Sequence, residues 1–384
     1  MDFSWRRETL IIVTLWLCVF LAGCGTGKKS LSTVAPEPTP LPSEIEFTIG
    51  ACPDFDASTL VQIRQHTSQL EAASTIIKAG RGPLNFGALK IDRANYAKFI
   101  SRLNDSFKSG YSQKFFKNEA QCVAAVDKDK ENPVLVSGYF TPVIEARRVK
   151  SARFSTPIYA RPPNLLNLDL KLFGLDEKQN QRKAVIENGK IRPFYSRAEI
   201  YKNTLPLAQV IAFVDPIDAF HSQTQGSMLL RFADGSRLSL EYADKNGQPF
   251  RALGLELPIT APITWQKIEE FLRALPPAEL ESTLARNPSY VFFKSSKVIA
   301  RTSSGAPAVA NYTAAIDPKV YPLASLGILK FAGENQAQLI IAHDTGGAIK
   351  GARRLDWYLG VGDEAAHIAG EMRQWGQYFT IIPR

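Results

Sequence analysis

The chain has 384 residues, of which 45% are hydrophobic and 22% are charged, and its formal net charge is +9 at pH 7. This balance excludes the disordered and fibrous classes and supplies enough apolar side chains for one large or two medium domains. A basic protein favours an acidic partner, such as nucleic acid, anionic lipid or the carboxylate-bearing peptides of a cell wall. A basic surface without a function is the alternative.

Residues 1–23 have the pattern of a secretory signal peptide. Two arginines precede an apolar run at residues 10–22, which is short for a membrane span but fits the hydrophobic region of a signal. The run ends in LAGC, the lipobox pattern of bacterial lipoproteins, in which the thiol of Cys24 is acylated. An ordinary cleaved signal with a chance cysteine is the alternative. Gly25 favours the outer membrane over the inner membrane as the site of the anchor.

Residues 24–45 contain alternating prolines and predict an extended, semi-rigid tether between Cys24 and a soluble domain. An exported protein rarely meets nucleic acid, so no nucleic acid is expected as a partner, and wall or lipid is preferred. The predicted location is the outer membrane, with the protein lipid-anchored and facing the periplasm.

Cys52 and Cys122 remain after the signal and the lipobox are set aside. In an oxidising compartment they can pair, and a buried free thiol is the alternative. The four histidines stand alone and no Cys-x-x-Cys pair occurs, so neither a metal site nor a cofactor is expected.

Apolar residues at helical spacing predict two helices, over residues 57–79 and 93–109. Residues 134–214 consist of short apolar runs broken by proline and glycine, a pattern typical of strands joined by loops. Two alternating runs within residues 228–243 meet at Asp234-Gly235, which predicts a β-hairpin whose turn needs a glycine with positive φ.

Two further helices are expected, one capped by Thr264 and one with Pro277 in its first turn. Beyond Asn287 the pattern predicts strands, then a helix over residues 363–375 and a last strand. The fold class is therefore mainly β with helices, without the regular βαβ alternation of a parallel sheet.

Asp344 and Asp356 are candidate catalytic carboxyls on either side of a glycine-rich turn. The Asp-Thr-Gly triplet at Asp344 is the local signature of an aspartic protease, but such an enzyme needs a second copy, which this long chain lacks. A sugar hydrolase would use both aspartates. Leu355 and Trp357 beside Asp356 favour its protonated form, as a general acid requires. A turn or capping role for either aspartate is the alternative.

Three segments near the C-terminus resemble the three-aspartate domain, with Asp317, Asp344 and Asp356 as its aspartates: AAIDPKVYPLASLGILK, AHDTGGAIKG and RRLDWYLGVGDEA. Upstream segments, among them SGYFTPVIEARR, TPIYARPPNL, QTQGSM and NPSYVFFK, are similar to successive motifs of the membrane-bound lytic murein transglycosylase A family. The resemblance runs through most of residues 134–370 in the same order and spacing.

The resemblance implies a double-psi β-barrel domain plus an inserted smaller β domain, with a groove between them for a glycan strand. The first part of the barrel domain is expected at residues 46–151, and the inserted domain at 152–288. The second part of the barrel, which is the three-aspartate domain, is expected at 289–384.

The resemblance also implies a peptidoglycan lytic transglycosylase, which cleaves the β-1,4 bond between MurNAc and GlcNAc without water and leaves a 1,6-anhydro-muramyl end. Asp356 matches the family's catalytic aspartate and would act first as acid and then as base, so a second catalytic carboxylate is not needed. Its expected partners are peptidoglycan glycan strands and, through Cys24, outer-membrane lipid.

Substrate contacts are implied at two places. Near the barrel they are Asp344, Thr345, Gly346, Gly347 and Asp317, with sugar-binding and barrel-holding roles left open between the two aspartates. In the inserted domain they are Gln225 and Ser227, which match polar members of the family's Gln-Gly-Ser-Gly motif.

The sequence departs from the family at Met228, which replaces the second glycine of that motif and is expected to reshape the groove wall, and at Ala324, which replaces a glycine. Four tyrosines are candidates either for stacking on sugars or for the core: Tyr139, Tyr159, Tyr195 and Tyr290. Two alternative functions remain: a non-catalytic wall-binding lipoprotein, and a hydrolase in which Asp344 activates water.

Overall fold

The computed structural model describes residues 46–55, 60, 63–64, 66–87, 89–110, 113–126, 132–175, 181–203, 205, 207–334 and 337–384. The chain divides into two compact units, Met1–Pro40 and Leu41–Arg384, and the described residues all belong to the second. The predicted signal peptide, Cys24 and the tether lie outside the described residues. Within the described part of the chain, no helix is long and apolar enough to cross a membrane.

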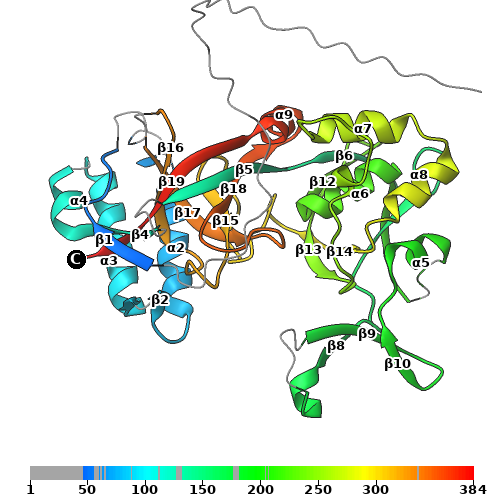
Figure 1. Ribbon diagram of the computed structural model, residues 1–384, viewed down its shortest axis with the longest axis horizontal. Helices are drawn as coiled ribbons and strands as arrows, with labels where there is room; N and C mark the ends of the chain where they lie inside the picture. Colours follow the sequence, from blue (N-terminus) through cyan, green and yellow to red (C-terminus); the bar gives the residue numbers. More distant parts are fainter. Residues whose placement is uncertain are drawn as a thin grey trace, which may run out of the picture. The chain divides into compact units, whose positions relative to one another are not determined.

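Six strands pair in a closed ring that forms a β-barrel (Figure 1). In order of pairing they are β5 (Pro133–Thr141), β19 (Arg373–Pro383), β16 (Leu326–Phe331), β17 (Ala337–Thr345), β15 (Thr313–Ile316) and β18 (Arg354–Val361). The ring closes because β5 pairs with both β18 and β19. The pairings of β15 with β17 and of β18 with β5 are parallel. Two further strands, β4 (Ala120–Val126) and β1 (Glu46–Gly50), extend the sheet from β19.

The barrel strands alternate between a buried apolar face and a face that carries polar groups. On β18, Leu355 and Trp357 belong to the apolar core together with Val136 of β5 and Ile340 of β17. Asp356 lies between Leu355 and Trp357 on the strand, so its side chain points to the opposite face.

A helical layer packs on the barrel next to β17 and β19. It contains α2 (Thr67–Ala79), the hairpin β2 (Leu84–Phe86) and β3 (Leu89–Ile91), α3 (Arg93–Lys108) and α4 (Gln113–Glu119). The helix predicted over residues 93–109 is confirmed as α3, which begins after the N-cap Asp92 because that carboxylate accepts the Asn95 N–H. Of the helix predicted over residues 57–79, the structure gives the part from Thr67 to Ala79 as α2.

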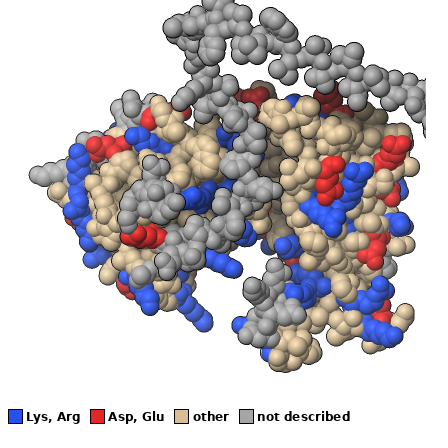
Figure 2. All heavy atoms as spheres, viewed as in Figure 1, with Lys and Arg blue, Asp and Glu red and all other residues tan. Residues whose placement is uncertain are grey.

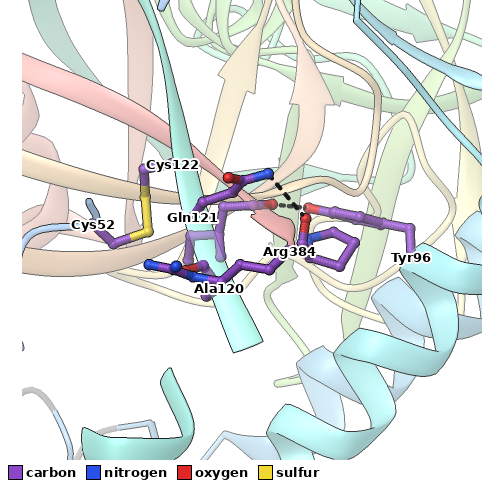
Figure 3. Close-up of a disulfide and its surroundings, with 8 residues drawn as sticks. Cys52, Tyr96, Ala120, Gln121, Cys122 and Arg384 are labelled. Atoms are coloured by element: carbon purple, nitrogen blue, oxygen red, sulfur yellow. Dashed lines mark hydrogen bonds between the residues drawn. A yellow bond between two sulfur atoms is a disulfide. The ribbon is translucent and has the colours of Figure 1, made fainter. Parts of the chain in front are cut away.

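Cys52 and Cys122 form a disulfide, with their Cα atoms 4.9 Å apart (Figure 3). The structure thus decides between the two alternatives for these cysteines. The bond ties the segment after β1 to β4. At the same edge, Arg384 Nε donates to the Ala120 carbonyl at 3.0 Å, which holds the end of the chain on β4.

A second sheet of six strands follows the barrel strand β5 after a single residue, Pro142. Its strands, in order of pairing, are β14 (Val291–Ser296), β13 (Arg237–Lys245), β12 (Ser227–Phe232), β6 (Val143–Arg147), β11 (Val210–Val214) and β7 (Thr156–Tyr159). Because β6 and β14 belong to it, this sheet extends on both sides of residues 152–288, and the division of the chain into domains stays a prediction.

The predicted hairpin is confirmed as β12 and β13, with Gly235 at φ 80° in the turn. The remaining elements are β8 (Leu166–Asp169), η1 (Leu170–Phe173), β9 (Gln181–Glu187), β10 (Lys190–Pro193), α5 (Arg197–Lys202), α6 (Pro216–Gln225), η2 (Leu253–Leu255), α7 (Trp265–Arg273), α8 (Pro277–Leu284) and α9 (Asp363–Glu371). Thr264 caps α7 and Pro277 begins α8, as predicted.

The helix predicted over residues 363–375 is shorter than expected. It is α9, which ends at Glu371, and β19 begins at Arg373. The predicted fold class is confirmed: the chain is mainly β with helices, and it combines a barrel with a second, inserted β sheet. The glycan groove between these two parts stays a prediction.

Candidate active site

Three adjacent strands place Asp344 and Asp356 on either side of one alanine. Ala315 of β15 pairs with Asp344 of β17 and with Asp356 of β18. On its other side, Asp356 pairs with Ser137 of β5. Residues in register on neighbouring strands point to the same face of a sheet. The two carboxyls therefore share one face of the barrel.

Asp356 is partly buried, and Ser137 donates the one side-chain hydrogen bond that it accepts from the described residues. Ser137 Oγ donates to Oδ1 at 2.8 Å, and Arg354 Nη2 donates to Ser137 Oγ at 3.1 Å. Burial raises the pKa of Asp356 to about 6, and the nearby Asp344 carboxylate acts in the same direction, while Ser137 and Arg354 act against it. A carboxyl with this pKa can give and take a proton near neutral pH, as a general acid and base must.

The sequence neighbours Leu355 and Trp357 do not bury the Asp356 carboxyl, because they point into the barrel core. The expected rise in pKa is confirmed, but the physical reason given from the sequence was wrong. Asp356 instead shares its face with Tyr358, two residues further along β18, and with Tyr139 of β5, whose rings lie 5.1 Å apart.

Asp344 is held by four hydrogen-bond donors. Its Oδ1 accepts the Ser303 N–H at 3.0 Å, the Ser303 hydroxyl at 2.7 Å and the Thr345 N–H at 2.9 Å. Its Oδ2 accepts the Tyr139 hydroxyl at 2.9 Å. Ser303 Oγ also lies 2.8 Å from Thr345 Oγ1, which brings Thr345 into the same network. These donors fix the orientation of the carboxylate and occupy both of its oxygens.

Ser227 and Gln225 reach the barrel strand β5 from the second sheet and from α6. The Thr141 hydroxyl lies 3.2 Å from Ser227 Oγ and 2.9 Å from the Tyr358 hydroxyl. Gln225 Oε1 accepts the Phe140 N–H at 3.3 Å. The polar residues predicted in the inserted domain therefore contact the strand that borders Asp356.

Asp317 lies apart from this network and is 4% exposed. Its Oδ1 accepts the Lys319 N–H at 3.1 Å and its Oδ2 accepts the Gly351 N–H at 2.8 Å. Its backbone carbonyl accepts the Tyr321 N–H at 3.0 Å. A buried carboxylate that accepts a backbone N–H on each oxygen joins two loops, which favours the barrel-holding role over sugar binding.

Gly346 and Gly347 follow the end of β17 in a turn closed by the Ile349 N–H, which donates to the Gly346 carbonyl at 3.1 Å. A Cβ added to Gly346 would come within 2.6 Å of Ile349 Cγ1, so the turn leaves no room for a side chain there. A Cβ on Gly347 would meet nothing within 4 Å. The turn thus requires glycine at the first position, and the space beside the second is open.

Several other residues singled out from the sequence have core roles. Tyr159 and Tyr290 are buried in one apolar cluster, and Tyr195 donates its hydroxyl to a glutamate on β9. Met228 is 0% exposed in the core of the six-stranded sheet, so the expectation that it reshapes a groove wall is wrong. Ala324 has φ 66°, a conformation that glycine adopts without strain.

Sequence reasoning missed three residues of the site: Ser137, Ser303 and Arg354. Ser137 had a usable signal, since Ser137, Tyr139 and Thr141 alternate along β5 and therefore share one face. Ser303 had none, because it lies in a loop that only the fold brings to Asp344.

The fold and the site define a β-barrel protein with an inserted β sheet and one partly buried aspartate that can exchange a proton near neutral pH. Two family models match the chain. The model described as the MltA specific insert domain matches residues 135–294, and the model of the 3D domain matches residues 312–382.

Known proteins are similar over most of the described chain. The membrane-bound lytic murein transglycosylase A of Escherichia coli K12 is 32% identical over 270 residues, which are 66% of this chain and 67% of that protein. The Vibrio cholerae protein of the same name is 29% identical over 274 residues, 66% of each chain.

Two solved structures share the fold. The membrane-bound lytic murein transglycosylase from Agrobacterium tumefaciens has a TM-score of 0.71 at 24% identity and covers 88% of this chain and 98% of its own. The structure of E. coli MltA with bound chitohexaose has a TM-score of 0.67 at 23% identity and covers 88% and 94%. The chain therefore belongs to the membrane-bound lytic murein transglycosylase A family and is an enzyme.

Proposed function

We propose that this enzyme cleaves the β-1,4 bond between MurNAc and GlcNAc in peptidoglycan and leaves a 1,6-anhydro-muramyl end, with Asp356 as the one catalytic carboxyl. Protonated Asp356 donates its proton to the glycosidic oxygen as the bond from C1 breaks. The resulting carboxylate then takes the proton from the C6 hydroxyl while O6 bonds to C1. The proton returns to Asp356, and no water is consumed.

The observation that carries this proposal is the contrast between the two aspartates. Asp356 combines burial, a pKa of about 6 and a single side-chain donor among the described residues. Asp344 accepts four hydrogen bonds from described residues, three on Oδ1 and one on Oδ2, which hold its carboxylate in place within a network. The arrangement supports one proton-transferring carboxyl and disfavours the two-carboxylate hydrolase.

A glycan strand as substrate is supported by the relative whose structure contains chitohexaose. The net charge of +9 suits a polymer whose peptides carry carboxylates. Figure 2 shows more Lys and Arg than Asp and Glu side chains on the face in view. We assign substrate contacts to Asp344, Thr345 and the open side of Gly347, and to Gln225 and Ser227 beside β5.

The experiment is digestion of purified sacculi by the wild type, Asp356→Asn and, as a matched control, Asp363→Asn, followed by mass analysis of the muropeptides. Asp363 is an exposed aspartate at the start of α9. We expect anhydro ends from the wild type and from the control, and none from Asp356→Asn. Reducing ends in place of anhydro ends would identify a hydrolase, and no release by the wild type would leave a wall-binding protein.

The location is proposed separately from the reaction. The lipobox supports acylation of Cys24 and attachment to the outer membrane, with the enzyme in the periplasm. Labelled palmitate should enter the wild type and not Cys24→Ala. Equal incorporation into both proteins, or into neither, would refute the anchor and leave the assignment of Asp356 untouched.

A further inference from the structure

Asp356 Oδ1 accepts from a chain of hydrogen bonds with a fixed direction, whereas its Oδ2 accepts from no residue that the structure describes. We propose that Ser137 and Arg354 are positioning residues that keep Oδ1 as an acceptor and make Oδ2 the oxygen that carries the catalytic proton. This inference rests on the proposed role of Asp356 as acid and base. It adds which oxygen acts, and which residues decide it.

The direction of the chain follows from the donors. A guanidinium has donors and no acceptor, so the contact of 3.1 Å between Arg354 Nη2 and Ser137 Oγ is a donation from the arginine. The hydroxyl of Ser137 carries one hydrogen, and this contact leaves it available. That hydrogen points to Asp356 Oδ1, which lies 2.8 Å away.

A protonated carboxyl has one O–H donor, and its other oxygen is the stronger acceptor. Since Oδ1 accepts from Ser137, the acidic proton belongs on Oδ2. No described residue donates to Oδ2, so this oxygen is left for the glycosidic oxygen and then for the C6 hydroxyl. Both transfers of the proposed reaction can therefore use the same atom.

The strands fix this geometry. Asp356 and Ser137 are paired residues of the parallel strands β18 and β5, and Arg354 lies two residues before Asp356 on the same face of β18. Neither partner depends on a loop. The orientation is therefore set before a substrate binds, as precise proton transfer requires.

Ionisable groups near Asp356 come from four strands. Arg354 and Tyr358 lie on β18, Tyr139 on β5 and Asp344 on β17. Arg373 of β19 pairs with Ser137, and its charge acts on Arg354. Burial and the Asp344 charge raise the pKa of Asp356, whereas the Ser137 hydrogen bond and the Arg354 charge lower it. Removing the Ser137 hydroxyl should therefore raise this pKa.

The test compares Ser137→Ala with Ser137→Thr, using initial rates on saturating sacculi between pH 4 and pH 9. Ser137→Ala should lower the rate about ten- to hundred-fold at pH 5, because Oδ2 is no longer oriented. The alkaline side of its pH–rate profile should move to higher pH by about half to one unit. A lost hydrogen bond of about 1 kcal/mol changes the pKa of Asp356 by that much. Ser137→Thr keeps a hydroxyl and should return the rate and the pH–rate profile toward the wild type.

Arg354→Met provides a second variant with the same expected direction, since it frees the Ser137 hydroxyl and removes a positive charge. An alkaline side of the pH–rate profile that stays in place or moves to lower pH in both Ser137→Ala and Arg354→Met would overturn this inference. A Ser137→Thr variant as slow as Ser137→Ala would also overturn it. Asp356→Asn, assayed in parallel, separates a failure of the positioning role from a failure of the proposed function. If it is inactive, such a result refutes only the positioning role. If it is active, the proposed function fails.

Discussion

Replacing Asp356 with asparagine is expected to stabilise the folded protein at neutral and alkaline pH while it removes activity. Asparagine keeps an oxygen that can accept from Ser137, and it has no charge to bury. In the wild type, the pKa of Asp356 is about 6 in the folded state, against its usual value of 3.8. The folded state therefore binds this proton more tightly than the unfolded chain does.

The sign of the effect follows from this order of the two pKa values. Below pH 3.8 Asp356 is protonated in both states, and its contribution to stability is fully present. As pH rises through about 6, the folded state loses that contribution, because it must then bury a charge. The two pKa values give a cost of about 1 kcal/mol at pH 4.5 and about 3 kcal/mol at pH 8.

Urea unfolding of the wild type and of Asp356→Asn at pH 4.5 and pH 8 measures this difference. The free energy of unfolding of the variant minus that of the wild type should grow by about 2 kcal/mol from pH 4.5 to pH 8. Any effect that does not depend on pH cancels in this comparison. A stability advantage that does not grow would mean that Asp356 is not desolvated, which would refute the physical basis of its proposed role as acid.

Asp344→Asn is the matched comparison. Its carboxylate accepts four hydrogen bonds, and an amide nitrogen in place of one oxygen would face a donor. This variant should lose about 1.5–3 kcal/mol of stability at pH 8. A gain in stability for both variants at pH 8 would contradict the distinction between the two aspartates.

Three further predictions test the scaffold and the network. Asp317→Asn should lower stability by about 1–3 kcal/mol while the rate per folded molecule on sacculi is retained; a folded but inactive variant would restore a sugar-binding role. Replacing both Cys52 and Cys122 with alanine should cost up to about 4 kcal/mol in urea unfolding, because the disulfide closes a span of 70 residues; an unchanged midpoint would contradict this. Tyr139→Phe, which frees Asp344 Oδ2, should lower the rate about tenfold with the fold intact by circular dichroism, and an unchanged rate would argue against the network.

Local patterns in the sequence predicted the elements that depend on local chemistry. The hairpin at Asp234-Gly235, the cap at Thr264 and the start of α8 at Pro277 follow from side chains within a few residues. The helix predicted to end at Trp375 stops at Glu371, because the next residues pair with β5 and β16. Pairing with distant strands overrode local helical spacing there.

The candidate site could be predicted only in part. The motif resemblance selected Asp344 and Asp356, but the partners that distinguish them come from β5 and from the loop that contains Ser303. Ser137 is 219 positions from Asp356 along the chain, and no local pattern reports the register of two strands so far apart. The role of Trp357 was misjudged for a simpler reason, since sequence neighbours on a strand point to opposite faces.

The hydrogen bonds on Asp344 also bear on which product forms. Inverting attack of water at C1 would need a second carboxylate as base, and Asp344, whose charge acts on Asp356, is the candidate. Its carboxylate is held by donors from Ser303, Thr345 and Tyr139, so its orientation is fixed by the protein. In the proposed reaction Asp356 is the base, and it acts after it has given its proton to the leaving oxygen. We infer that the network around Asp344 favours attack by the substrate's own C6 hydroxyl, because that route needs one carboxyl used twice.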